Sequence, residues 1–318
     1  MKKFLKIKKA TIGMALCVLF VSMTAGSFYT AEASSNIDKQ NNARAKALYP
    51  QCVEKFDSND IKGAAACFMQ ADEYAKKEPL YKILAGDSLK ILKQYSSAVR
   101  YYEDAINNAA KNKKMKDKVK QKAYIGLAES YAEINNKEKA LEYADKSIRE
   151  YGKDYRGHYI KGFVLQKDNP SEAIEEYKKS LEVDKKQYNS YVKLIRLYKD
   201  KGDIGNAINT YKEAIDYRPL DEDMKMAFAN LYISETQKEG SNVNYYPQAI
   251  EVLKSLTSVN NQNAQAHYFL STLYLLQGDK ENCYKELDLT NALNTGLGNR
   301  LSKEITAYLK KQINEKQA

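Results

Sequence analysis

The chain has 318 residues, of which 43% are hydrophobic and 29% are charged, with 26 Tyr, 5 Pro and no Trp. This composition suits a packed helical protein and is too apolar for an intrinsically disordered one. The formal net charge is +10, but residues 34–318 carry only 46 basic and 40 acidic groups. That modest excess permits anionic partners without indicating a nucleic-acid-binding protein.

Residues 1–33 have the pattern of a signal peptide. An apolar run extends from Ala10 to about Val21, and Ala31 and Ala33 provide the small residues of an A-x-A cleavage site. The basic residues before the run are Lys2, Lys3, Lys6, Lys8 and Lys9. We therefore expect cleavage after Ala33 and a secreted or extracytoplasmic chain. The alternative is an uncleaved membrane anchor, although the apolar run is short for crossing a bilayer.

Two cysteines near the start of the expected mature chain are placed to form a disulfide. Cys52 and Cys67 lie equally far from a turn that we expect at Asn59 and Asp60, so they reach equal height on two antiparallel helices. A disulfide is plausible in an exported protein, and the alternative is a pair of buried thiols. Cys283 is expected to be a small buried hydrophobe.

Small residues recur along the chain with steps of 34, 42, 33, 34, 42 and 34. They are Ala64, Ala98, Ala140, Ala173, Ala207, Ala249 and Cys283. Four positions later stands a large residue in six of seven cases, namely Phe68, Tyr102, Tyr177, Tyr211, Leu253 and Leu287, whereas Ala144 is the exception. A period near 34 indicates helical hairpins that bury their apolar faces by stacking on their neighbours.

The clearest repeat spans Tyr188 to Asp221 and carries large or small residues in fixed columns: Tyr191, Leu194, Ile195, Tyr198, Ala207, Tyr211, Ala214 and Pro219. In these columns the chain resembles the tetratricopeptide repeat (TPR) family. The resemblance implies an all-α solenoid of about seven hairpins over residues 45–295, after a linker at 34–44 and before a capping helix and tail at 298–318. The expected units lie near 45–78, 79–120, 121–154, 155–187, 188–221, 222–263 and 264–297.

Turn residues support these helix boundaries independently. Gly202-Asp203 and Gly278-Asp279 each place a C-terminal glycine before an N-cap carboxylate, and Asn169-Pro170 is typical of a helix start. The two longer steps hold extensions at Lys111–Lys122, which contains seven Lys, and at Glu235–Pro247. In a solenoid such insertions map to loops or lengthened helices.

No pattern in the sequence supports catalysis or metal binding. His158 and His267 are three repeats apart and are expected to be packing residues, so we expect no metal site and no cofactor. No Ser-His-Asp or Cys-His arrangement and no Gly-rich phosphate loop is evident. Carboxylates are interpreted as solvated helix faces with i,i+4 pairs, such as Glu175 with Lys179. A non-enzymatic protein is therefore expected.

The TPR resemblance implies that the first helices of the hairpins line a concave face that binds a protein or peptide partner. The inward positions carried over from the family are Arg156, Tyr159, Phe163, Asn189, Lys193, Arg196 and Asn230. In the last repeat, Tyr268, Phe269, Leu275 and Leu276 form an apolar patch that the final helix or a partner covers. The alternative function is binding of a cell-wall polymer or an anionic surface through Lys-rich and Tyr-rich surfaces, including Lys113, Lys114 and Lys116.

Overall fold

The computed structural model describes residues 36–109 and 116–317. All regular structure within these residues is helical, which confirms the predicted all-α fold class. The predicted signal peptide and Lys113 and Lys114 lie outside the described residues. Among the described helices, none combines the length and the apolar character that a membrane-spanning helix requires.

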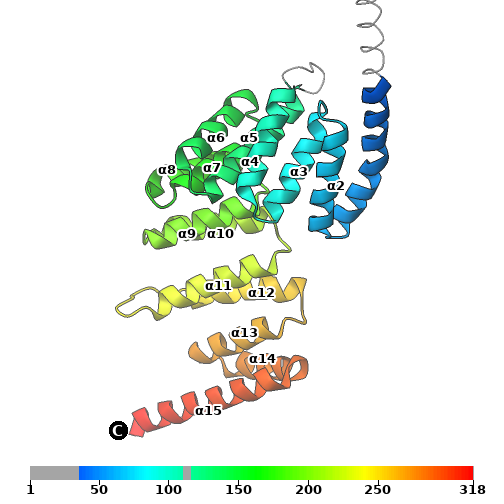
Figure 1. Ribbon diagram of the computed structural model, residues 1–318. Coiled ribbons are helices and arrows are strands. Elements are labelled where there is room, and N and C mark those ends of the chain that lie inside the picture. The colour runs from blue at the N-terminus through cyan, green and yellow to red at the C-terminus, as the bar shows by residue number, and fades with distance from the viewer. Residues whose placement is uncertain (1–35, 110–115, 318) are drawn as a thin grey trace, which may run out of the picture. The chain divides into compact units, whose positions relative to one another are not determined.

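The chain divides into two units, which are described separately. Unit 1 ends at Asn169 and unit 2 begins at Pro170. In unit 1 each helix packs against the next, as Figure 1 shows for α2 to α5. Its helices are residues 36–57, α2 (Ile61–Tyr74), α3 (Pro79–Ile91), α4 (Tyr95–Ala109), α5 (Lys116–Glu133), α6 (Lys137–Glu150) and α7 (Tyr155–Leu165).

Unit 2 is a second series of packed helices. They are α8 (Pro170–Val183), α9 (Tyr188–Asp200), α10 (Ile204–Tyr217), α11 (Glu222–Gln237), α12 (Tyr246–Val259), α13 (Ala264–Leu276), α14 (Lys280–Leu293) and α15 (Thr295–Gln317). The boundary between the units falls after α7, within the repeat predicted at 155–187 rather than between repeats. Within the units, α7 packs on α5 and α6, whereas α8 packs on α9.

The core of unit 1 is organised around Tyr102 on α4, which is fully buried. Its ring lies against Gly86 on α3 and Gly126 on α5, where an added Cβ would meet ring atoms at 2.8 and 2.3 Å. Its hydroxyl donates a hydrogen bond of 2.6 Å to Asp87 Oδ1. The large residue of one hairpin therefore fills a gap that glycines of two neighbouring first helices leave open.

Five of the turns between described helices share one geometry. Gly202 and Gly278 have φ near +72° and +78°, and Asp203 and Asp279 cap the following helices, which confirms both predicted turns. The same left-handed position is occupied by Asn59, Lys93 and Asn135 in unit 1, and the residue after each donates its N–H to a carbonyl five residues earlier. This bond satisfies helix-end carbonyls in Schellman turns.

A disulfide joins the first two helices of unit 1. Cys52 lies on the helix at 36–57 and Cys67 on α2, with their Cα atoms 5.3 Å apart. Both residues are buried, and Cys52 packs with Ala64 and Phe68 in the same cluster. The bond closes a loop across the turn at Asn59.

The two predicted extensions adopt different structures. The described part of the Lys-rich extension lengthens α5, which begins at Lys116 and has 18 residues. The second extension forms the connection between α11 and α12, and α12 has a proline in its first turn. In this connection the Tyr245 N–H donates a hydrogen bond of 2.8 Å to Thr236 Oγ1.

Helix α15 caps unit 2 by packing on α13 and α14. Leu301 and Ile305 are buried there, whereas Ile313 further along the same stripe is 55% exposed. Tyr268 of the predicted apolar patch donates a hydrogen bond to Glu304 on α15. The final helix therefore covers at least this part of the patch.

Candidate functional site

Unit 1 carries a groove on the face formed by its first helices α3, α5 and α7, which we call inner groove 1. It encloses about 270 Å³ and is lined by Lys90, Ile91, Tyr95, Glu129, Ala132, Glu133, Tyr159, Ile160 and Phe163. Ile91 is 51% exposed at its edge. Lys90 forms an ion pair with Glu129. Burial and the nearby Glu133 raise the pKa of Tyr95. The groove therefore combines an apolar wall with acidic groups.

Unit 2 carries a corresponding groove between α9 and α11, which we call inner groove 2. It encloses about 290 Å³ and is lined by Tyr188, Val192, Ile195, Arg196, Lys199, Asp200, Tyr211, Asp223, Met224 and Ala227. Val192 is 38% exposed, and Arg196 Nε lies 3.7 Å from Asp200 Oδ2. This groove is similar in size to inner groove 1 but has a balanced charge.

The seven residues predicted for partner binding divide between the two units. Tyr159 and Phe163 line inner groove 1, and Arg196 lines inner groove 2. Arg156 is the second residue of α7 and does not line inner groove 1, and its Nη2 lies 2.6 Å from Asp154 Oδ2. Although burial acts to raise it, these hydrogen bonds from Arg156 lower the pKa of Asp154. The guanidinium of Arg156 is therefore engaged within the protein.

The other three predicted residues do not line inner groove 2. Asn189 is exposed on α9 and Asn230 is exposed on α11. Lys193 is partly buried, and its pKa is lowered by burial and by the neighbouring charge of Arg196. Sequence reasoning missed Val192, although it lies three and four residues from Asn189 and Arg196 on the same helix face. The sequence signal for Val192 was an apolar residue between two polar residues on a helix face that was expected to be exposed.

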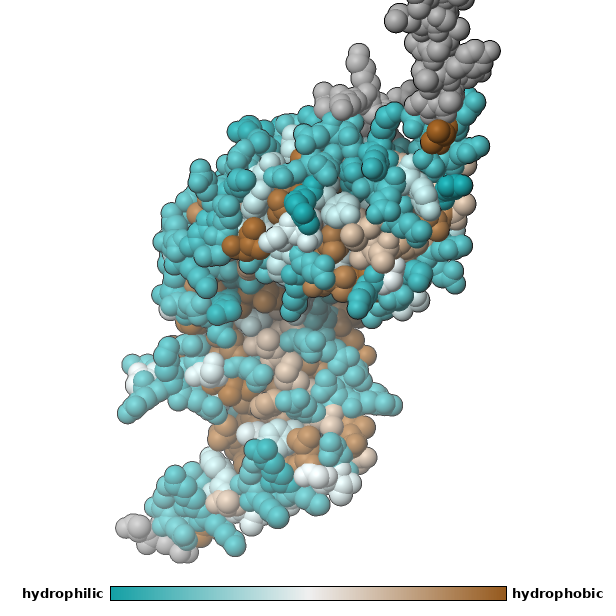
Figure 2. Space-filling view, viewed as in Figure 1, coloured by the Kyte–Doolittle hydropathy of each residue, from teal (hydrophilic) through white to brown (hydrophobic). Residues whose placement is uncertain are grey.

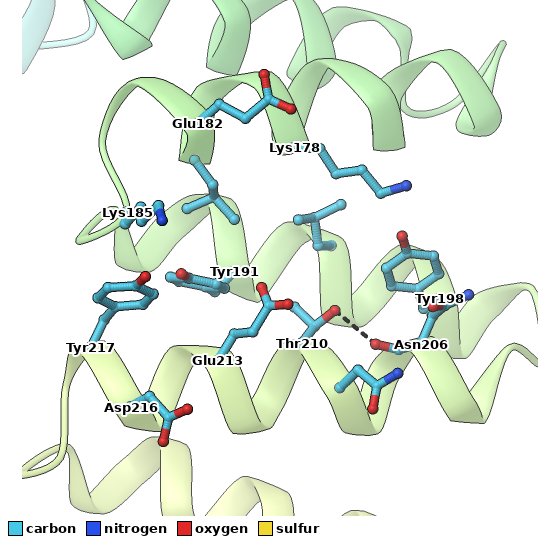
Figure 3. Close-up of a pocket in the computed structure, with 13 residues that line it drawn as sticks. Lys178, Glu182, Lys185, Tyr191, Tyr198, Asn206, Thr210, Glu213, Asp216 and Tyr217 are labelled. Atoms are coloured by element: carbon cyan, nitrogen blue, oxygen red, sulfur yellow. Dashed lines mark hydrogen bonds between the residues drawn. The ribbon is translucent and has the colours of Figure 1, made fainter.

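Unit 2 also holds a larger groove that the sequence did not predict. This outer groove lies between the second helices α8 and α10, has α9 as its floor, and encloses about 570 Å³ (Figure 3). Its lining comprises Lys178, Leu181, Glu182, Lys185, Tyr191, Leu194, Tyr198, Asn206, Asn209, Thr210, Glu213, Asp216 and Tyr217. Figure 3 shows Lys178 and Glu182 on one side and Glu213 and Asp216 on the other.

Ion pairing on α8 differs from the sequence prediction. Glu175 was expected to pair with Lys179, but it pairs with Lys178 at 3.0 Å, and Lys179 pairs with the buried Glu176 at 3.0 Å. Both observed pairs have i,i+3 spacing, which also places side chains on one helix face. The prediction was wrong because Lys178 and Lys179 are both within reach of Glu175 and Glu176. The fold buries Glu176, and Lys179 pairs with it, which leaves Lys178 to pair with Glu175.

Many of the tyrosines serve packing. In unit 1, Tyr124 and Tyr131 are buried, and the ring of Tyr131 stacks on Tyr143 with centroids 5.8 Å apart. In unit 2, Tyr211 and Tyr232 are buried against Phe228. Figure 2 shows mainly hydrophilic side chains on the visible face of unit 1. These buried rings lend no support to a Tyr-rich polymer-binding surface, which stays a prediction.

The two histidines lie in different units, and His267 is buried. Its Nε2 lies 3.1 Å from the carbonyl of Asn261 and its Nδ1 contacts Glu286. Within residues 36–109 and 116–317, no group of three or more His, Cys, Asp or Glu side chains is arranged to hold a metal ion. Cys283 is buried, and burial raises the pKa of its thiol.

In a comparison with known proteins, one repeat matches a family model. Residues 188–219, which contain α9 and α10, match the family model described as tetratricopeptide repeat. This segment is similar to a tetratricopeptide repeat. It supplies the floor and one wall of the outer groove and one helix of inner groove 2.

Proteins that are similar to longer parts of the chain have low sequence identity to it. A TPR repeat-containing protein of Methanocaldococcus jannaschii is 27% identical over 163 residues, and the aligned region covers 50% of this chain and 28% of that protein. The structure of the C-terminal part of a TPR repeat-containing protein from Cytophaga hutchinsonii has a TM-score of 0.55 at 13% identity, covering 78% of this chain and 95% of that chain. A TPR protein from Parabacteroides merdae has a TM-score of 0.47 at 19% identity, covering 82% and 98%. The Cytophaga likeness shows a TPR solenoid fold.

Proposed function

We propose that the chain is an exported, non-enzymatic scaffold that binds protein or peptide partners through the inner grooves of its tetratricopeptide-like hairpins. The observation that carries this proposal is an exposed apolar residue at each groove, Ile91 and Val192, beside fixed charges. Stacked helical repeats commonly present such first-helix faces as extended binding surfaces. The fold thereby supports binding.

The chemistry of the grooves suits a short peptide segment. An apolar side chain of the partner would cover Ile91 or Val192, and burying the part of either residue that is now exposed would contribute roughly 1 kcal/mol. Lys90 already pairs with Glu129 at inner groove 1, so the acidic group there that favours a basic partner residue is Glu133. Arg196 and Asp200 at inner groove 2 accept either charge. The two grooves therefore bind the same kind of apolar side chain but favour different charged residues next to it in the peptide.

Export is supported by the signal pattern in residues 1–33 and by the disulfide between Cys52 and Cys67. Disulfides persist mainly in oxidising compartments.

Selection of random displayed peptides on the full chain tests the binding function. We expect peptides with an apolar anchor, and we expect Ile91→Glu or Val192→Glu to weaken binding at the altered groove by about tenfold, because the carboxylate replaces apolar contact area. Affinity is measured by fluorescence anisotropy. Both residues are exposed, so the fold should tolerate the changes.

Leu289→Glu is the matched control, because Leu289 is an apolar residue on α14 that is 38% exposed and lies outside both inner grooves. Its affinity should equal that of the unaltered chain. Failure to select any peptide, or an equal loss with Leu289→Glu, would contradict binding through the inner grooves.

A further inference from the structure

The outer groove differs from both inner grooves in the helix faces that build it. Its floor is Tyr191, Leu194 and Tyr198, whereas inner groove 2 uses Tyr188, Val192 and Ile195 of the same helix. These two sets lie on different faces of α9 because each follows its own i,i+3,i+4 spacing. A partner in the outer groove would therefore leave inner groove 2 accessible.

The walls of the outer groove carry carboxylates without counter-ions. Glu182, Glu213 and Asp216 are exposed, and none forms a hydrogen bond or ion pair with another described residue. Glu213 and Asp216 are three residues apart on α10, so their side chains share one face. Figure 3 shows both on the same side of the groove, across from Glu182.

The two cations at the groove are already engaged. Lys178 Nζ pairs with Glu175 at 3.0 Å, and Lys185 Nζ lies 5.7 Å from the centroid of the Tyr217 ring. The ring contact leaves Lys185 charged, but the three unpaired carboxylates outnumber this one ammonium group, so the unpaired groups along the groove carry a net negative charge. Because Glu213 and Asp216 remain solvated, they attract a cationic partner most strongly at low salt.

A buried polar group also opens onto this groove. Tyr191 is only 1% exposed, lines the groove, and makes no hydrogen bond to another described residue. Burial raises its pKa to about 12, and the charges of Glu213 and Asp216 act in the same direction. The hydroxyl therefore stays protonated at neutral pH and keeps its oxygen available to accept a hydrogen bond.

We propose that the outer groove binds an extended, arginine-bearing segment of a partner protein. The guanidinium presents five donors in a plane, enough for Glu213 or Asp216 together with the Tyr191 hydroxyl. The amide of Asn209 on α10 is exposed in the groove and can bond the peptide backbone. An ammonium group would match this set less well, because it is compact and more strongly hydrated.

Peptide display on the full chain tests the proposal. We expect arginine to be enriched among selected peptides relative to the input library. Glu213→Gln combined with Asp216→Asn should abolish this enrichment and weaken the best arginine peptide roughly fivefold to tenfold. Tyr191→Phe should weaken it severalfold, as should replacing the peptide arginine by lysine.

The matched control is Glu281→Gln combined with Asp288→Asn, two exposed carboxylates on α14 outside the groove. This variant loses the same charge and should keep the arginine enrichment. Circular dichroism melting checks that each variant is folded. No enrichment of arginine, equal enrichment of lysine, or an equal loss with the control would overturn the proposal.

The inner-groove variants separate this proposal from the proposed function. Val192→Glu should leave the arginine peptide bound while displacing the apolar-anchor peptides. If Val192→Glu displaced the arginine peptide and the Glu213→Gln, Asp216→Asn variant did not, the outer-groove assignment would be wrong and binding through inner groove 2 would stand.

Discussion

Tyr102→Ala is expected to destabilise unit 1 by about 3–5 kcal/mol, the range measured when a large core side chain is truncated. Tyr102 is fully buried between α3 and α5, and its ring contacts two glycines, which have no side chains of their own to fill the cavity. Hydrogen-exchange protection of α3, α4 and α5 should fall together, since all three border the cavity. Tyr102→Phe is the control: it removes only the bond to Asp87 and should cost far less.

A second substitution tests whether the Tyr102 ring is the reason that position 126 is a glycine. In an ordinary helix, Gly→Ala stabilises by about 1 kcal/mol. At Gly126 the new Cβ would lie 2.3 Å from Tyr102 Cζ, so Gly126→Ala should instead destabilise unit 1 by roughly 1–3 kcal/mol. In the Tyr102→Ala background the same change should become neutral or stabilising. An unchanged sign between the two backgrounds would refute the contact as the cause.

Removal of the Cys52–Cys67 disulfide is expected to destabilise the first hairpin by roughly 3 kcal/mol, the value for closing a loop of about 15 residues. The effect should be local, because α2 packs on α3 and stands near the N-terminal end of unit 1. Exchange at α2 should become faster in Cys52→Ala combined with Cys67→Ala, while α8 to α15 keep their protection. Reductant should reproduce the effect in the unaltered chain and have none in the double variant.

The same bond provides a test of export. Intact-mass analysis of the chain from its own cells should show a start at Ser34 and two thiols that resist alkylation until a reductant is added. A chain that retains residues 1–33 in the cytoplasm, with both thiols free, would contradict the exported scaffold.

Much of the fold follows from the sequence because its determinants are local. Ala98 and Tyr102 lie one turn apart on one helix, and this pair of a small and a large residue repeats in register along the chain. Gly202 and Gly278 mark turns because few other residues adopt positive φ without strain. Lys93 occupies the same conformation without any such signal, because the stacked hairpin determines the turn there.

The candidate sites follow from the sequence less completely. Tyr159, Phe163 and Arg196 were predicted from column positions and line the inner grooves. Arg156 has the right position, but Asp154 two residues earlier engages it. The position of a residue in the repeat determines the direction in which its side chain points from the helix. Which groups pair with a charged side chain depends on the atoms that the fold brings near it.

By itself, the sequence determined the helical hairpins, their period, their turns and the pairing height of Cys52 and Cys67, since each depends on spacing within one or two helices. Tertiary structure decided the rest. The outer groove exists because α8 and α10 leave α9 accessible between them, and its character depends on Glu213 and Asp216 staying unpaired after packing. The packed molecule determines the distances between separate helices and the choice among ion-pair partners. No single position of the sequence repeat specifies them.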